Sequence, residues 1–404
     1  MHKSLWNKDY ILLLQGTAVS HIGDLLYSVA IGYWVYEKTG SSALMGLLSS
    51  ISMFMTMFVM PFSGTIIDRC DRKAVIVGMD VLRGLLMLGV GILAFSGQLS
   101  VGAVLVTAFL ASACGTFFTP AVATLMIDLI PPDDMVRGQS LHSGVMTGLG
   151  VVGKALSGAL VVLLGVPTIV IVNGVSYLFS ALTELFITVP QRKMQEKQAA
   201  RNHLLSDFAL GLREIRNSPY LRLFIPGALV INLLCAGPLS LMLPFALEKG
   251  FTLDMYGYLM SIQTAASLLG VCLLGIVKLK PGTRYWMLTL GFLGSILFVI
   301  PAYISSHFLL VCIMLFLSFF ANTLGNSILN ASLALALPEG NRGAILGLVS
   351  AASVGGSALS TLAYGFLCDR FPLYLVFLAG NLLAVFPMLH LCLHKDMKGF
   401  ILTH

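Results

Sequence analysis

Long apolar stretches alternate with short polar breaks along the whole chain. Dividing the chain at its clusters of charged residues, Pro and Gly gives twelve apolar spans, at residues 10–36, 42–67, 74–95, 100–126, 138–164, 168–189, 222–247, 253–277, 284–303, 307–337, 342–368 and 371–393. Each span meets the length of about 20 apolar residues that a helix needs to cross a bilayer. A membrane-spanning strand needs only about 10 residues and alternates in polarity, whereas these spans are apolar on all sides. The pattern predicts an all-α integral membrane protein with twelve transmembrane helices.

One long hydrophilic segment separates the first six spans from the last six. It predicts an N-terminal six-helix bundle at residues 1–189, a cytoplasmic linker at 190–221 and a C-terminal six-helix bundle at 222–404. Apolar residues recur at helical spacing within the linker and indicate an amphipathic helix on the cytoplasmic leaflet. These residues are Leu204, Phe208, Leu212 and Ile215.

A short motif recurs at the same place in the two halves. A segment with Leu and Pro, followed by an acid and an Arg-Gly pair, occupies residues 129–138 after the fourth span and 335–343 after the tenth. Internal repetition of this kind is typical of transporters, whose substrate sites lie near the interface between the repeats. We therefore expect two pseudo-symmetric bundles that share a substrate site.

The composition agrees with a membrane protein and argues against several other classes. Of 404 residues, 57% are hydrophobic and 10% are charged, and the mean hydropathy is +0.91. A soluble domain carries about a quarter of its residues as charged side chains. The first span is too long for a signal peptide, and no small-residue cleavage site follows it. The seven cysteines are scattered and no two have C-x-x-C spacing, so we expect no metal, no redox site and no cofactor. Neither a phosphate-binding loop nor a nucleophile motif is present, and we expect no enzymatic activity.

Lys and Arg residues are distributed unevenly over the polar breaks. Nineteen lie in one set of breaks, which includes both termini and residues 190–221, and only Lys38, Lys249 and Arg370 lie in the opposite set. Because cytoplasmic loops carry the excess of Lys and Arg, both termini and the middle segment are predicted to be cytoplasmic. Membrane topology thus explains the net charge of +6, and no nucleic-acid partner is expected.

The break after the second span contains a dense cluster of charges, G-T-I-I-D-R-C-D-R-K at residues 64–73. It resembles the loop 2–3 signature of the major facilitator superfamily, G-x-x-x-D-R-x-G-R-[KR], with an Asp in place of the second Gly. The matching residues are Gly64, Asp68, Arg69, Arg72 and Lys73. The resemblance implies a gating motif that latches the two halves in the outward-facing state. Asp68 would then dock against the positively polarised N-terminus of the eleventh span.

Four segments resemble the macrolide-efflux group of that superfamily: residues 21–24, 36–41, 68–73 and 116–121. The resemblance implies export of small amphipathic molecules, usually driven by inward proton flow. It thus implies a drug-resistance antiporter of a bacterial plasma or inner membrane, which we expect to be a monomer surrounded by membrane lipids. The chain departs from the pattern in two spans. The fourth span lacks the Arg that efflux proteins often carry, and in the fifth span Lys154 follows Gly153 where drug antiporters usually have Pro.

Two acidic residues inside the spans are candidates for proton coupling. An ionisable residue in hydrocarbon costs about 2.5–3.5 kcal/mol on insertion scales, so each one requires an explanation. Asp24 lies near the middle of the first span and either binds protons or substrate or is permanently hydrogen-bonded to a neighbouring helix. Glu184 lies near the end of the sixth span and either titrates or extends to the interface. Asp80 and Arg83 are spaced i, i+3 and predict a structural ion pair.

Lys154 lies in the middle of the fifth span among several glycines. It is a candidate for the substrate cavity, where it would attract an anionic headgroup or pair with Asp24. The alternative is a structural ion pair, or a side chain that extends along a Gly-lined groove.

Uncharged polar residues also interrupt the spans. Asn322, Asn326 and Asn330 recur every four residues in the tenth span, so they share a helix face that contacts either another helix or the cavity. Tyr33, Asn232 and Gln263 are further candidates for the substrate cavity. With Asp24 and Lys154 they complete the predicted set.

These observations favour a secondary active transporter that exports amphipathic drugs or related molecules by alternating access, with protons as the coupling ion. A lipid or lysophospholipid flippase of the same fold is the main alternative, in which Lys154 would bind a phosphate. A membrane receptor or assembly factor without transport activity is a third hypothesis, which the short loops disfavour.

Overall fold

The structure is a computed structural model that describes residues 5–67, 70–188, 213, 216–277, 280–336, 342–395 and 398–399. These residues form helices and no strands. The helices of the first half are α1 (Lys8–Thr39), α2 (Ser42–Ile67), α3 (Arg72–Phe95), α4 (Val101–Leu129), η1 (Pro132–Asp134), α5 (Met135–Leu164) and α6 (Val166–Leu185). Those of the second half are α8 (Pro219–Cys235), α9 (Gly237–Ser240), α10 (Met242–Glu248), α11 (Leu253–Ile276), α12 (Pro281–Ile304), α13 (Phe308–Ala336), α14 (Arg342–Cys368) and α15 (Leu373–Leu393).

The helix lengths agree with the twelve predicted spans. Within the described part of the chain, eleven helices are long and apolar enough to cross a membrane. The remaining span is α1, whose 32 residues extend over about 48 Å at 1.5 Å per residue. The amphipathic helix predicted around Leu204–Ile215 lies outside the described residues.

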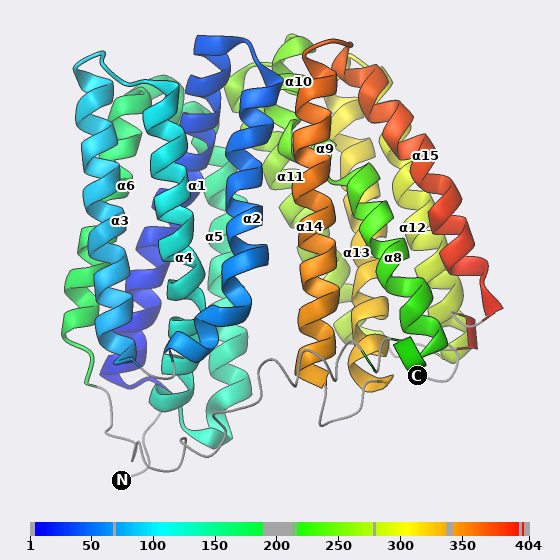
Figure 1. The fold of residues 1–404 in the computed structure, drawn as a ribbon, viewed down its shortest axis with the longest axis horizontal. Coiled ribbons are helices and arrows are strands. Elements are labelled where there is room, and N and C mark those ends of the chain that lie inside the picture. Colours follow the sequence, from blue (N-terminus) through cyan, green and yellow to red (C-terminus); the bar gives the residue numbers. More distant parts are fainter. Residues whose placement is uncertain are drawn as a thin grey trace. The chain divides into compact units, whose positions relative to one another are not determined.

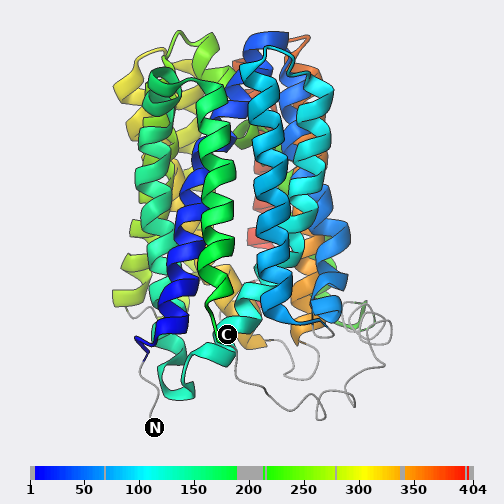
Figure 2. The same cartoon turned by 90° about the vertical axis from the view of Figure 1, so that its left-hand side faces the viewer.

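The chain divides into two units. The first unit comprises Met1–Arg192 together with Thr252–Ser261, and the second comprises Lys193–Phe251 and Ile262–His404. In the first unit α6 packs against both α1 and α3, and α4 packs against α2 and α3 (Figure 1). In the second unit α12 packs against α13, and α8 packs against α14 and α15. Figure 2 shows α3 and α4, in blue and cyan, side by side in the first unit.

Glycines allow α3 and α6 to approach closely. A Cβ atom at Gly84 on α3 would lie 2.8 Å from the Leu178 side chain, and one at Gly174 on α6 would lie 3.0 Å from the backbone nitrogen of Leu88. Small residues are the usual means by which membrane helices gain packing contacts, because lipid supplies little hydrophobic driving force. This close approach allows polar side chains on α3 to contact polar side chains on α6.

The seventh span is broken, although the sequence predicts one continuous helix at 222–247. It consists of α8, the single turn α9 and α10. Pro238 follows Gly237 at the break, and proline cannot donate the backbone hydrogen bond that continues a helix. The side chains of α14 satisfy the freed backbone groups: Ser360 accepts from the Gly237 amide at 2.8 Å, and the Tyr364 hydroxyl donates to the Leu234 carbonyl. Such breaks within a membrane are tolerated where neighbouring helices supply these bonds.

In the second unit α12 and α13 are packed through glycine as well. A Cβ atom at Gly291 on α12 would lie 2.8 Å from the Ala321 carbonyl oxygen and 3.2 Å from the Gly325 nitrogen. Both are backbone atoms, which cannot rotate away. At Gly294, one turn later on α12, a Cβ atom would lie 3.7 Å from the Phe298 ring, an ordinary van der Waals distance.

We predict that Gly291→Ala destabilises the protein whereas Gly294→Ala does not. Overpacking at Gly291 should lower the free energy of unfolding by about 1–3 kcal/mol. At Gly294 the added methyl fits, and alanine favours a helix by about 1 kcal/mol over glycine. Thermal melting of the two purified variants in the same detergent measures the difference. Equal melting temperatures would show that α12 and α13 are not in close backbone contact at Gly291.

Candidate functional site

A polar cluster lies between three helices of the first unit. Asp24 on α1 is half-buried, and its carboxylate accepts a hydrogen bond from the Tyr177 hydroxyl on α6. Asn173, one turn earlier on α6, donates its side-chain amide to the same carboxylate oxygen at 3.5 Å. The guanidinium of Arg83 on α3 donates to the Tyr177 hydroxyl oxygen at 3.4 Å. Tyr177 therefore connects Asp24 to Arg83.

Arg83 also forms the ion pair that the sequence predicts. Its Nη2 atom lies 2.9 Å from Oδ1 of Asp80, three residues earlier on α3. Only 6% of the Arg83 surface is exposed, and none of Asp80. The guanidinium lies over two aromatic rings, 4.3 Å from the centroid of Phe118 and 4.6 Å from that of Tyr177. Cation–π contacts of this kind stabilise a desolvated guanidinium. The pair is thus part of a cluster with Asp24, which the sequence analysis did not foresee.

Glu184 completes the set of buried acids. It lies on the last turn of α6 and is 1% exposed, so the interpretation that its side chain extends to the interface is wrong. Ser180 donates to its Oε1 at 3.3 Å, while Oε2 has no hydrogen-bond partner in the described part of the chain. Glu184 and Asp80 are close enough to interact electrostatically. α6 thereby brings an acid toward the Asp80–Arg83 pair.

The charges of this cluster do not balance if every acid is ionised. Asp24, Asp80 and Glu184 surround one guanidinium, so full ionisation would leave two uncompensated negative charges. Uncompensated charge in a low-dielectric interior is strongly unfavourable. The cluster is therefore suited to hold protons on its carboxyl groups. Of the three acids Asp24 has the most accessible surface.

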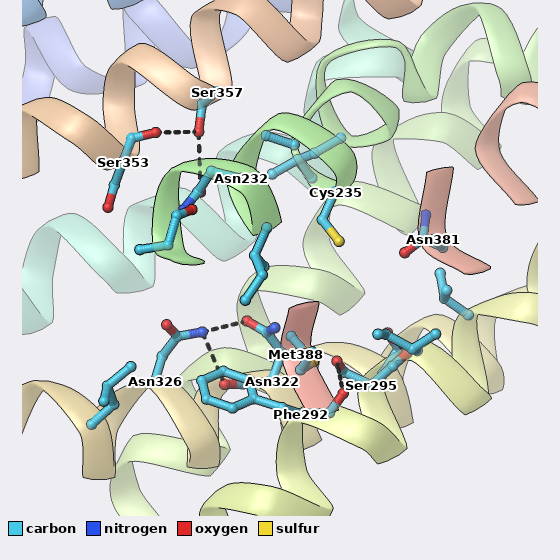
Figure 3. Close-up of a pocket in the computed structure, with 18 of the residues that line it drawn as sticks. Asn232, Cys235, Phe292, Ser295, Asn322, Asn326, Ser353, Ser357, Asn381 and Met388 are labelled. Carbon is cyan, nitrogen blue, oxygen red and sulfur yellow. Dashed lines mark hydrogen bonds between the residues drawn. The ribbon is translucent and has the colours of Figure 1, made fainter. Parts of the chain in front are cut away.

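A cavity of about 380 Å³ lies within the second unit, between α8, α12, α13, α14 and α15 (Figure 3). Four predicted residues line it: Asn232, Asn322, Asn326 and Asn330. The structure adds polar residues that the sequence analysis missed, namely Ser295, Ser318, Ser353, Ser357 and Asn381. Single serines in apolar spans give no periodic signal. The broken seventh span contributes Cys235, Leu239 and Met242 to the wall.

Hydrogen bonds order two sides of the cavity. On α13, Asn326 donates its amide to the Asn322 side-chain oxygen at 2.8 Å and to the Asn322 backbone oxygen at 3.1 Å. On the other side the Ser357 hydroxyl of α14 donates to the Asn232 side-chain oxygen at 3.2 Å. Asn232 donates its own amide to the Ala228 carbonyl at 2.9 Å. Figure 3 shows the two pairs as separate polar groups of the wall.

The other predicted cavity residues lie elsewhere. Gln263 is buried on α11 and is not among the described residues that line the cavity. Tyr33 on α1 donates its hydroxyl to Glu37 at 3.1 Å. Lys154 is half-buried on α5, and its backbone carbonyl accepts from Ser157 at 2.7 Å. Tyr33 and Lys154 belong to the first unit, as Asp24 does.

The predicted gating motif is described in part. Gly64 lies within α2, and Arg72 and Lys73 begin α3, whereas Asp68 and Arg69 lie outside the described residues. Arg72 forms an ion pair with Asp128 near the end of α4. Asp71, which replaces the second Gly of the signature, caps α3 by accepting from the Lys73 amide at 3.0 Å. An N-cap aspartate satisfies an otherwise unpaired helix donor.

Comparisons with known proteins agree with this architecture. A family model described as Major Facilitator Superfamily matches residues 13–358 and 228–398. Macrolide efflux protein A of Streptococcus pyogenes is 23% identical over 218 residues, 51% of this chain and 54% of that protein, so the chain spans about half the length of this relative. Multidrug efflux pump Tap of Mycobacterium tuberculosis is 23% identical over 380 residues, 91% of this chain and 89% of that protein.

A solved structure gives the same result for the fold. The crystal structure of a bacterial homologue of the human lysosomal transporter Spinster, inward-facing and unoccupied, matches with a TM-score of 0.72 at 16% identity. The match covers 98% of this chain and 97% of the other. The predicted fold class is thus confirmed, as is the resemblance to the macrolide- and drug-efflux group.

We predict that Arg83→Gln destabilises the protein and that adding Asp80→Asn restores part of the loss. Removing one partner of a buried ion pair leaves an uncompensated charge and costs about 3–5 kcal/mol, whereas removing both charges costs less. Thermal melting of the parent, the single variant and the double variant in detergent measures the effect. A single variant that melts like the parent would show that the guanidinium does not compensate the buried acids.

Proposed function

The chain belongs to the major facilitator superfamily, and from this premise we propose that it exports amphipathic drugs or related small molecules by alternating access, in exchange for protons. As a member of that superfamily it is a transporter, and it is a multi-pass membrane protein. We propose a bacterial plasma or inner membrane, with both termini in the cytoplasm and one chain as the functional unit.

The direction of transport is proposed from the relatives. Both the macrolide efflux protein and the pump Tap are named as exporters, and the match to Tap extends over nine-tenths of the chain. At 23% identity the substrate itself does not carry over. Efflux of drugs or related compounds is the property that the two names have in common.

The observation that carries proton coupling is the Asp24–Tyr177–Arg83 connection. Asp24 is partly accessible, so water can supply or remove its proton. When ionised, Asp24 is stabilised by the Tyr177 hydroxyl and the nearby guanidinium. When it is protonated, this attraction is lost and Arg83 is left with Asp80. Proton binding thereby changes which groups hold α1, α3 and α6 together, which is the kind of two-state element that a coupling ion needs.

Substrate binding is proposed for the cavity of the second unit, with Asn232, Asn322, Asn326 and Asn330 as contact residues. Discontinuous helices form the substrate sites of many transporters, and the break after α8 borders this cavity. Met242 and Met388 give its wall soft, adaptable side chains, which suit several substrates. For Lys154, Tyr33 and Gln263 a role in substrate binding remains a proposal from the sequence.

The motif at residues 64–73 is proposed as the gate. The pairing of Arg72 with Asp128 joins the start of α3 to the end of α4, and Asp71 caps α3. These contacts fix the start of α3. A latch formed by Asp68 would need such a fixed point.

We predict that Asp24→Asn abolishes proton-driven transport but preserves exchange. Asn mimics a permanently protonated acid, so the empty carrier no longer releases a proton, whereas substrate-for-substrate exchange needs no proton release. In proteoliposomes, uptake of a radiolabelled macrolide driven by a pH gradient should fall at least tenfold, and counterflow should persist. Asp133→Asn is the matched control, because Asp133 is exposed on η1. Gradient-driven uptake at the parent rate in Asp24→Asn would contradict the assignment.

The same proteoliposomes test the alternatives. Movement of a labelled lysophospholipid that ignores the pH gradient would favour a flippase. Macrolide binding without any flux would favour a receptor. Gradient-driven macrolide flux with no lipid movement supports the exporter.

A further inference from the structure

We propose that the cavity of the second unit selects uncharged ligand groups that hydrogen-bond, such as hydroxyl and amide groups, and discriminates against cations. This deepens the proposed function and rests on it. The ligand class is therefore a neutral amphiphile with hydroxyl or amide substituents, such as a glycoside.

The first observation is the absence of charge from the cavity wall. Among the described residues that line it, none is Asp, Glu, Lys or Arg. A cation that enters such a space gives up part of its hydration without gaining a counter-ion, which is unfavourable. The buried acids that could attract a cation belong to the first unit. A neutral group pays no such penalty.

The second observation is the set of hydrogen-bonding groups on α13. Asn326 uses its amide nitrogen on Asn322, so its own side-chain oxygen remains an acceptor and the amide nitrogen of Asn322 remains a donor. Within the described residues neither group has a protein partner, and the Asn330 side chain has none either. The three residues are four apart, so they present donors and acceptors about every 6 Å along the helix. A single hydroxyl or amide group of a ligand can therefore donate one hydrogen bond and accept another along this row of side chains.

The third observation is the combination of size and apolar surface. A volume of about 380 Å³ lies at the lower end of the roughly 300–1,000 Å³ that is typical of ligand pockets. A cavity of this size can hold a whole small amphiphile, or a single substituent of a larger molecule. Phe292, Ile296 and Met388 line the same cavity and suit the apolar part of such a ligand.

Transport of a neutral ligand in exchange for a proton would move net charge across the membrane. If a neutral molecule leaves as a proton enters, each cycle moves positive charge inward. An inside-negative membrane potential should then drive export without any pH gradient. One-for-one exchange of a monovalent cation for a proton would not respond to the potential.

Two probes with the same apolar part test the proposal: 2-naphthyl glucoside, which is neutral, and naphthylmethyl-trimethylammonium, which is a cation. Binding is measured on the full chain in nanodiscs. We expect the parent to bind the glucoside at least tenfold more tightly than the ammonium. Asn326→Asp, which adds a carboxylate to the cavity, should shift this ratio at least tenfold toward the ammonium. Asn326→Leu should weaken glucoside binding at least fivefold.

Thr323→Val is the matched control, since the Thr323 hydroxyl donates to the Phe319 carbonyl of its own helix at 2.8 Å and does not line the cavity. It should bind both probes like the parent, and thermal melting should confirm that all variants fold. A parent that prefers the ammonium, or binds no glucoside, would overturn the proposal, as would an unchanged ratio in Asn326→Asp. Glucoside binding without proton-coupled flux would instead remove the proposed function and leave this selectivity in place.

Discussion

Burial of the Arg83 guanidinium is the constraint on which the first unit depends. A charge in the low-dielectric interior of a membrane protein must be paired, and here the pairing involves three helices. Asp80 supplies the ion pair from α3 itself, Tyr177 supplies a hydroxyl from α6, and Phe118 covers the guanidinium from α4. The helix packing around it follows from this requirement. Without close contact between α3 and α6, the guanidinium would reach neither the Tyr177 hydroxyl nor its ring.

The two units have different chemistry. The first unit places three acids and an arginine in its interior, whereas the cavity of the second unit is lined by carboxamides, hydroxyls and apolar groups. Buried carboxyl groups can exchange protons, and carboxamides cannot titrate in the physiological range. Proton binding and recognition of a neutral ligand can therefore be assigned to separate units. In the proposed mechanism alternating access couples them, because no acid is buried among the described residues of the second unit.

Much of the fold is predictable from the sequence, because spans need only length and apolarity. The second and eleventh predicted spans, 42–67 and 342–368, match α2 and α14 at both ends. The break at Gly237 was missed, since a Gly-Pro pair in an apolar run is compatible with a kink or a full interruption. What decides between them is whether a neighbouring helix offers partners, and Ser360 and Tyr364 are more than 120 residues away. Those contacts belong to the tertiary structure and cannot be read from the local sequence.

The candidate site was predictable only as separate residues. Asp24 and Glu184 stand out because acids are rare in apolar spans, and the Asn stripe of α13 stands out because of its period. The partners carry no such signal. Tyr177 is an ordinary aromatic residue of a membrane span, and its contact with Asp24 joins positions 153 residues apart. Whether it meets Asp24 depends on the rotation of α6 relative to α1, which periodicity in an apolar helix does not fix.

The three acids of the polar cluster in the first unit differ in how far they are exposed. Asp80 and Glu184 are sealed inside the first unit, with 0% and 1% of their surfaces exposed, whereas Asp24 is half-buried. Gly23 beside it allows α1 to lie against α6, because a Cβ atom there would collide with Asn173 and Ser176. A movement of α1 therefore changes the environment of Asp24 directly. It reaches Asp80 through Tyr177 and Arg83, and it reaches Glu184 through Ser180, which lies against Gly16 of α1. Under the proposed coupling, the proton therefore enters and leaves at Asp24, and the two sealed acids influence how strongly Asp24 holds it.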